Sequence, residues 1–291
     1  VFLIMPGAVG DNITRLSWVC AVPIVAACAP LPRRLLVGAL ALLAIWPVAD
    51  MVEQMSATGN PSAKASFYQP LSDHLAQAQA AVGNSALGER VEVIDPDNHW
   101  ASVYLSSLSL ARGWDRQADN ADNPIFYKQG LLNATSYHQW LNQLAVGWVA
   151  LPAVPLDYAS VAEAKLVGSG LSYLDLVWSS PQWRLYRVDQ PAPLADGATV
   201  TAVEPGSLTL DVPSASASNV SVRVRWSPYL VTVDPVTQRT IPSCIADADG
   251  WVQLYLPGAA RVELTSHFDP AHRLSASDQA CIQSLAGTEP G

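Results

Sequence analysis

The order of apolar and polar positions divides the chain into three parts, of which the first is almost wholly apolar. Charge-free apolar stretches cover residues 16–31 and 35–49. Each is shorter than the roughly 20 residues of a membrane-spanning helix, and adjoining residues lengthen both. Neither has the polar face that a surface helix of a soluble protein carries. The pattern predicts that residues 1–52 form the end of a transmembrane helix bundle; a buried helical hairpin in a soluble protein is the alternative.

The turn between the two stretches predicts their orientation. It contains Arg33 and Arg34 and no acidic residue, and short loops rich in Lys and Arg remain in the cytoplasm. Trp18 and Trp46 both lie near the ends of the two stretches that are remote from this turn, as in the aromatic belt at one membrane interface. We therefore expect an integral membrane protein that has the lipid bilayer as a partner and in which everything after Asp50 is extracytoplasmic.

The second part, residues 53–190, alternates between the two hydrophobic periods of helices and strands. We expect helices over residues 70–81, 99–105, 133–144 and 158–167, and strands over residues 91–94, 108–111, 148–151, 173–178 and 183–188. Strands that alternate with helices are typical of an α/β domain. The sequence thus predicts a small extracytoplasmic α/β domain.

The third part, residues 191–291, changes to a period of two. Expected strands cover residues 199–203, 207–212, 220–226, 252–256 and 260–268, with Pro, Gly, Ser and Asp between them. Short alternating strands without intervening helices predict a β-sandwich. The expected fold class is therefore α/β plus all-β behind N-terminal transmembrane helices.

Composition and charge narrow the function classes. The chain has 291 residues, a formal net charge of -9 and only 14% charged residues, whereas an average soluble domain has about 25%. The acidic balance and the lack of a basic stripe exclude nucleic acid as an expected partner. Because the first residue is Val1 and residues 1–5 are apolar without a basic segment before them, we interpret the chain as the C-terminal piece of a larger membrane protein. The alternative for residues 1–5 is a core strand of a complete soluble protein.

The four cysteines fall into two pairs. Cys20 and Cys28 lie in the first apolar stretch, whereas Cys244 and Cys281 lie in the part expected outside the cytoplasm. Oxidising compartments permit disulfides, so we predict a bridge between Cys244 and Cys281. Two free thiols are the alternative.

Polar and aromatic residues gather between residues 95 and 117. Trp rings stack on the faces of sugar rings while charged groups bind the hydroxyls, and a His near carboxylates suits acid–base chemistry. A purely structural role, in which Trp and Arg pack the domain and Asp115 pairs with a neighbouring Arg, is the alternative. The candidate substrate-binding residues are Asp95, His99, Trp100, Arg112, Trp114 and Arg116.

Other sites are not expected from the sequence. Asp115, Asp119 and Asp122 could gather around calcium, but they lack the Gly and the terminal Glu of an EF-hand loop. The histidines show no metal-ligand spacing, and no glycine-rich phosphate loop or G-x-S-x-G elbow is present. We therefore expect neither a metal nor a cofactor.

Several short runs resemble bacterial polytopic membrane proteins of the glycosyltransferase C type, related to membrane proteins with a pyruvoyl-tetrahydropterin-synthase-related domain. The runs are Asn98-His99-Trp100, Ala111-Arg112-Gly113-Trp114-Asp115-Arg116-Gln117, Asn123-Pro124-Ile125-Phe126-Tyr127, Val149-Ala150-Leu151-Pro152 and Leu156-Asp157-Tyr158. The resemblance implies a bacterial plasma-membrane protein that transfers sugar from a lipid-linked donor. It also implies that the catalytic carboxylate lies upstream of Val1, so that no catalytic residue is assigned in this chain.

Two functions follow as hypotheses. The first is an accessory extracytoplasmic domain of a membrane glycosyltransferase-like protein that acts on envelope glycans, with glycan or lipid-linked sugar as a ligand. In that case Trp100, Arg112 and Trp114 line a groove that faces the membrane. The second is a non-enzymatic envelope protein that binds a glycan or a protein partner. A weaker hypothesis, the end of a transporter, lacks the intramembrane charges that mark transport paths.

Overall fold

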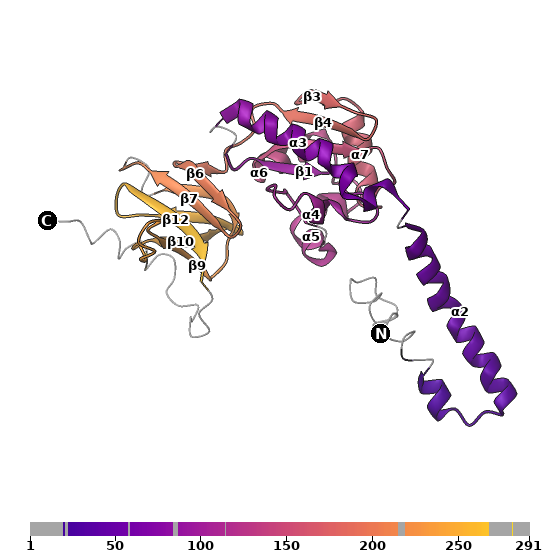
Figure 1. The fold of residues 1–291 in the computed structure, drawn as a ribbon. Helices are drawn as coiled ribbons and strands as arrows, with labels where there is room; N and C mark the ends of the chain where they lie inside the picture. The colour runs from indigo at the N-terminus through magenta and orange to yellow at the C-terminus, as the bar shows by residue number, and fades with distance from the viewer. Residues whose placement is uncertain are drawn as a thin grey trace.

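The structure, a computed structural model, describes residues 20, 23–57, 59–83, 87–113, 115–214, 219–267 and 281. A helical arm is followed by an α/β region, residues 59–188, and then by a β-rich region, residues 195–266 (Figure 1). Mixed α/β content followed by β-rich content is the coarse fold class that the sequence predicts. The N-terminal residues 1–19, which include Trp18, lie outside the described residues, as does most of the C-terminal tail.

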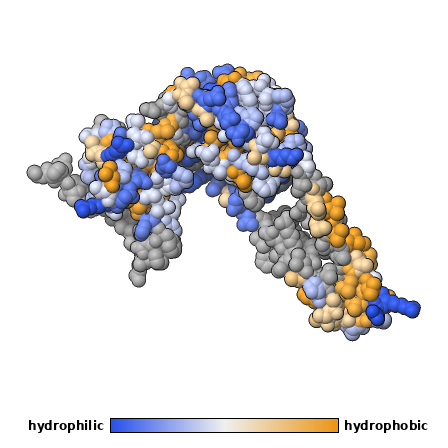
Figure 2. Space-filling model, viewed as in Figure 1, coloured by the Kyte–Doolittle hydropathy of each residue, from blue (hydrophilic) through white to orange (hydrophobic). Residues whose placement is uncertain are grey.

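The arm is an apolar helix that projects from the folded regions (Figure 1). Residues 23–28 are helical, a short turn follows, and α2 then runs from Arg33 to Ala57. Apolar side chains on α2 are exposed, as the orange surface of the arm in Figure 2 shows; they include Leu35, Val37, Leu42, Ile45 and Val48. The helix therefore extends past residue 52, the end of the expected first part of the chain, to Ala57.

A helix that spans a bilayer must be long enough and apolar enough to cross the hydrocarbon core. Within the described part of the chain, no helix meets the length and apolar character required to span a bilayer.

The α/β region is built on a four-stranded sheet with the order β1-β2-β4-β3. Its strands are β1 (Arg90–Val93), β2 (Val146–Pro152), β3 (Leu174–Ser179) and β4 (Trp183–Val188). β1 and β2 are parallel, whereas β2 with β4 and β4 with β3 are antiparallel. All residues of β2 are buried, as expected for a strand covered on both faces.

Helices cover both faces of this sheet. They are η1 (Pro61–Ala63), α3 (Ala65–Val82), α4 (Ala101–Tyr104), α5 (Arg116–Asp122), η3 (Pro124–Phe126), α6 (Ala134–Gln143) and α7 (Val161–Gly168). One apolar core joins Tyr137 of α6 to Val149 of β2, and a second joins Leu71 of α3 to Trp148 of β2. Because successive side chains of a strand point to opposite faces of the sheet, β2 contributes to both cores.

Several elements of this region differ from the prediction. α5 is a helix that the sequence did not predict, and Asp115 caps it by accepting hydrogen bonds from the N–H groups of Gln117 and Ala118. The predicted strand over residues 108–111 forms only an isolated bridge between Leu110 and Val91. α3 begins at Ala65, before the predicted start at residue 70.

The β-rich region consists of two four-stranded antiparallel sheets, with the orders β10-β11-β8-β5 and β6-β7-β12-β9. The strands are β5 (Ala195–Asp196), β6 (Thr199–Glu204), β7 (Ser207–Val212), β8 (Val220–Arg225), β9 (Leu230–Val233), β10 (Cys244–Ala248), β11 (Trp251–Tyr255) and β12 (Ala260–Ser266). Side chains from both sheets share one apolar core, for example Leu254 of β11 and Leu210 of β7. The sequence did not predict β5, β9 and β10.

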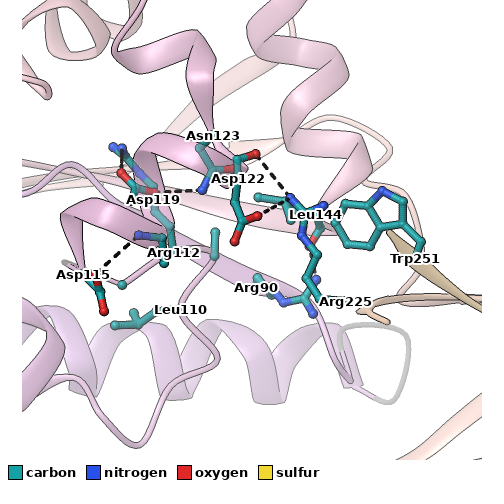
Figure 3. A pocket seen from close by; sticks show the side chains of 13 residues that line it. Arg90, Leu110, Arg112, Asp115, Asp119, Asp122, Asn123, Leu144, Arg225 and Trp251 are labelled. Atoms are coloured by element: carbon teal, nitrogen blue, oxygen red, sulfur yellow. Dashed lines mark hydrogen bonds and ion pairs between the residues drawn. The ribbon is translucent and has the colours of Figure 1, made fainter. Parts of the chain in front are cut away.

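Contacts join the β-rich region to the α/β region. Trp251 of β11 packs against the core that contains Tyr137. Arg90 of β1 donates hydrogen bonds to the carbonyls of Leu144 at 2.6 Å and of Arg223 at 2.8 Å. A cavity of about 330 Å³ lies beside these contacts (Figure 3).

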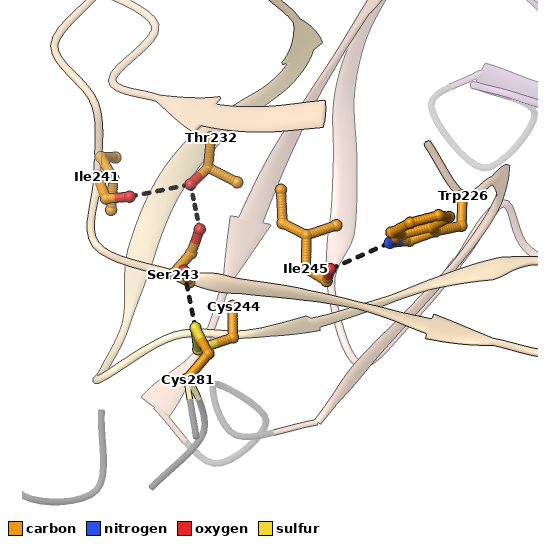
Figure 4. Close-up of a disulfide and its surroundings, with 7 residues drawn as sticks. All are labelled: Trp226, Thr232, Ile241, Ser243, Cys244, Ile245 and Cys281. Carbon is orange, nitrogen blue, oxygen red and sulfur yellow. Dashed lines mark hydrogen bonds between the residues drawn. A yellow bond between two sulfur atoms is a disulfide. The ribbon is translucent and has the colours of Figure 1, made fainter. Parts of the chain in front are cut away.

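A disulfide fastens the C-terminal tail to the β-rich region. Cys244, the first residue of β10, is bonded to Cys281 (Figure 4). This is the predicted pairing. Cys20 and Cys28 are free cysteines.

Candidate functional site

The candidate site lies at the edge of the sheet where the two parallel strands end. Asp95 follows β1 by two residues, and Asp157 follows β2 after a short loop. The N–H of Asp157 donates to the carbonyl of Asp95 at 3.0 Å, which holds the two loops together. Ligands of α/β proteins bind at the carboxyl ends of parallel strands, so this edge is the expected place for a site.

His99 lies between the two carboxylates. Its Nδ1 is 3.6 Å from Asp95, and its Nε2 is 3.5 Å from Asp157. Its backbone has a φ of 57°, in the left-handed region that non-glycine residues rarely adopt. Such local strain occurs preferentially at functional sites, where the surrounding structure maintains it.

Arg116, the first residue of α5, completes this group of charged side chains. Its guanidinium donates to both carboxylate oxygens of Asp157, at 3.3 and 2.8 Å, and lies over the ring of Tyr158 at 4.5 Å. Burial acts to raise the pKa of Asp157, but the hydrogen bonds from Arg116 and from the N–H of Ala159 outweigh it and lower the pKa. Asp157 is therefore a carboxylate at neutral pH.

These residues line a small hollow, which we call the strand-end hollow; its volume is about 10 Å³, room for roughly one water molecule. Its lining is almost entirely polar or charged and includes Asp95, His99, Arg116, Tyr127, Asp157 and Ser160. It gathers carboxylate acceptors and guanidinium and imidazole groups at one small opening, which suits the hydroxyl groups of a ligand that lies across that opening.

Arg112 lies behind the hollow, at the centre of a buried network of charges. Its Nε is 2.7 Å from Glu92, one terminal nitrogen is 3.3 Å from Asp119, and the other is 2.6 Å from Glu163. The Arg112 side chain is 6% exposed, and those of Glu92 and Glu163 are 0% exposed. Three carboxyl groups thus surround one buried guanidinium.

Tyrosines extend the network into the core. Tyr137 of α6 donates to Glu163 at 2.8 Å, and Tyr127 donates to Asp119 at 2.5 Å. Burial raises the pKa of both Glu92 and Glu163, against the lowering effect of the Arg112 charge. Strongly shifted carboxyl groups beside an open polar hollow are typical of functional sites, although structural networks also produce them.

The structure places the sequence-predicted residues in different settings. Asp95, His99 and Arg116 come together at the strand-end hollow, and Arg112 contributes to its inner wall. Trp100 is 42% exposed and stacks on Tyr104 at 5.6 Å between ring centroids, outside this lining. Arg112 is buried among carboxyl groups. The predicted groove of Trp100, Arg112 and Trp114 stays a prediction. Trp114 lies outside the described residues.

Sequence reasoning missed several members of the site. Glu92 has a detectable signal, since a charged residue inside an otherwise apolar strand needs a buried partner. Glu163 lies on α7, 51 positions from Arg112, and short-range patterns could not pair them. Asp157 has a signal only through the short run that resembles membrane glycosyltransferase-like proteins.

The acidic residues of α5 do not form a cation site together. Asp115 caps the helix, Asp119 joins the Arg112 network, and Asp122 lies 4.0 Å from Arg225. No group of three or more potential metal ligands is found among the residues that the structure describes.

Comparison of the chain with protein-family models, with curated proteins and with solved structures finds no significant match. The site must therefore be interpreted from its own chemistry.

Proposed function

We propose that the chain is the membrane-anchored, extracytoplasmic accessory part of a glycosyltransferase-like protein, and that it binds an envelope glycan at the strand-end hollow. The observation that carries the proposal is the convergence of Asp95, His99, Arg116 and Asp157 at the ends of β1 and β2. Carboxylates accept hydrogen bonds from sugar hydroxyls, while guanidinium and imidazole groups donate to sugar oxygens.

Aromatic groups next to the hollow support a sugar ligand. Tyr158 is 68% exposed and already holds Arg116 over its ring. Trp100 is 42% exposed and rests on Tyr104. Exposed aromatic rings held in place by packing provide faces on which the apolar side of a sugar can stack.

The apolar arm supports the anchored location. Residues 35–49 of α2 carry no charge, and Leu42 is 71% exposed to solvent in the isolated chain. Burial of such side chains in lipid is favourable by about 25 cal/mol per Å². Arg33 and Arg34 at the start of α2 would then remain at the cytoplasmic surface.

The test measures glycan binding by the whole chain in lipid nanodiscs, using a panel of bacterial envelope oligosaccharides. The variant Arg116→Gln removes the cation that faces the hollow but leaves the buried network in place. We expect it to weaken glycan binding by about tenfold, the loss of one charge-assisted hydrogen-bond pair. Arg184→Gln, at an exposed arginine of β4 outside the lining, is the matched control and should bind as the parent chain does.

Two outcomes would contradict parts of the proposal. Equal binding by the parent chain and by Arg116→Gln would remove the strand-end hollow as the site. Chains that remain in the aqueous phase when mixed with liposomes would remove the membrane anchor. Glycan binding without any effect of the chain on sugar transfer by the longer protein would instead favour a non-enzymatic envelope protein.

A further inference from the structure

A second cavity lies between the α/β region and the β-rich region and is distinct from the strand-end hollow. It has a volume of about 330 Å³. One wall comes from α5 and contributes Asp115, Asp119 and Asp122; Arg90, Arg225 and Trp251 also line the cavity (Figure 3). Among the described residues, only Arg112, Gly113 and Asp119 line both cavities.

Arg90 lines this cavity with a guanidinium that is bonded to backbone carbonyls. It donates to the carbonyl oxygens of Leu144 and Arg223, at 2.6 and 2.8 Å. Among the described residues, no carboxylate lies within ion-pair distance of Arg90. Burial, and then the charge of Arg225, lower the pKa of Arg90 to about 10, so that it remains charged at neutral pH.

Arg225 brings a second positive charge to the same cavity. Its guanidinium lies over the ring of Trp251 at 4.2 Å and donates to the carbonyl of Asp122 at 3.2 Å. Its carboxylate partner, Asp122, is 4.0 Å away and 52% exposed. Exposed pairs at such distances contribute little, so Arg225 is weakly neutralised.

Two arginines that line one cavity repel each other, and an anion bound between them would offset this repulsion. A guanidinium has five N–H donors in a planar arrangement that matches carboxylate and phosphate groups. Arg90 uses both terminal nitrogens for carbonyls, and its guanidinium has further N–H groups on a side chain that lines the cavity. Figure 3 shows Arg90 and Arg225 lying together near Trp251.

The α5 side of the cavity requires donors rather than a second anion. Asp115, the N-cap residue of α5, presents a carboxylate there, and Asp122, the last residue of α5, presents one beside Arg225. Hydroxyl groups donate to carboxylates. A ligand that fits both walls therefore carries one anionic group and several hydroxyl groups. We propose that this cavity binds a sugar acid or a sugar phosphate, with its anionic group held by Arg90 and Arg225. The proposal goes beyond the glycan site and rests on different residues.

The experiment measures binding by titration calorimetry with the whole chain in detergent micelles. The probes are glucuronate, glucose 6-phosphate and neutral glucose. Glucuronate or glucose 6-phosphate should bind saturably, glucose should not, and added salt should weaken the interaction. Whichever anion binds more tightly identifies the carboxylate or the phosphate as the group recognised.

The variants separate the cavity from the rest of the surface. Arg225→Gln should weaken binding of the anion by about tenfold, as expected for loss of a charge-assisted contact. Arg184→Gln removes the same charge from β4 and should have no effect. Because Arg225 is 43% exposed, its replacement should leave the fold intact, which thermal unfolding of the variant checks.

Three results would overturn the assignment. These are equal binding of glucose and the anions, no saturable binding of either anion, or an unchanged affinity in Arg225→Gln. Arg116→Gln, which alters the strand-end hollow, should leave anion binding unchanged, so failure of this proposal and failure of the glycan site give different patterns.

Discussion

The two folded regions bury different kinds of side chain. Within its described residues, the α/β region encloses the carboxyl groups of Glu92, Asp119 and Glu163 around Arg112. The buried polar residues of the β-rich region, by contrast, are Thr209 and Thr232 in the part that the structure describes, and its core is otherwise aliphatic. Both regions fold around an apolar core, but the α/β region adds a buried network of charges.

This difference identifies a buried part of the molecule whose amino-acid composition is not explained by stability alone. Replacing a buried ion network with apolar residues of similar volume is often neutral or stabilising, so stability does not require the Arg112 network. The aliphatic core of the β-rich region requires only the hydrophobic effect. The charged interior adjoins both cavities, which makes it the part of the molecule where a functional constraint is expected.

The largest expected effect comes from removing the cation of the network. Arg112→Met would leave three buried carboxyl groups without a positive partner, at a cost of about 3–5 kcal/mol in the free energy of unfolding. Chemical denaturation followed by circular dichroism measures it, with Arg184→Met as the exposed control. A loss below about 1 kcal/mol would mean that the network is dispensable.

A truncation in the aliphatic core should have a somewhat smaller effect. Leu254 is fully buried between the two sheets, and a buried Leu→Ala change costs about 2–5 kcal/mol. We expect Leu254→Ala to lower stability by about 3 kcal/mol at every pH, because the described side chains of that core are apolar. If the stability lost in Leu254→Ala varied strongly with pH, the two regions would unfold together and the titrating groups of the α/β region would affect the core of the β-rich region.

The smallest effect is a pH dependence confined to the α/β region. Burial raises the pKa of Glu92 and Glu163 above their ordinary value of 4.5. The folded state therefore keeps protons that the unfolded chain has lost, so this contribution to stability is full below pH 4.5 and falls as the pH rises. Glu163→Gln, which cannot ionise, should make this decline shallower in measurements from about pH 5 to about pH 8.

Denaturation midpoints across that pH range measure the decline. Glu204→Gln is the control, because Glu204 is an exposed acidic residue at the end of β6, in the other folded region. Equal slopes for the parent chain and Glu163→Gln would show that the buried carboxyl groups titrate normally.

Local patterns were sufficient for most of the elements. The helix predicted over residues 133–144 is α6, where Asn133 forms a capping box with Ser136 and Tyr137, Trp140 and Leu141 are buried. Strand β7 coincides with the predicted residues 207–212. These elements combine a strong period with a clear start or end signal, so that neighbouring residues alone determine them.

The elements and site residues that the sequence did not predict depend on contacts between residues that are far apart in the chain. α5 has no apolar face, and it is held by the Asp115 cap and by the Asp119 contact with Arg112. Glu163 meets Arg112 only because β1 and β2 are adjacent and parallel, which brings α5 and α7 to one edge. The membrane location and the glycan ligand stay predictions.

The disulfide gives the end of the chain an unusual mechanical role. Cys244 and Cys281 are separated by 37 positions, so β10, β11 and β12 lie inside a covalent loop. A force applied to the C-terminus passes directly to Cys244, at the start of β10, and bypasses all three strands. Reduction would release a hidden contour length of roughly 130 Å, at about 3.5 Å per extended residue. The bridge thus decides which strands of the β-rich region can bear tension when a partner pulls on the tail.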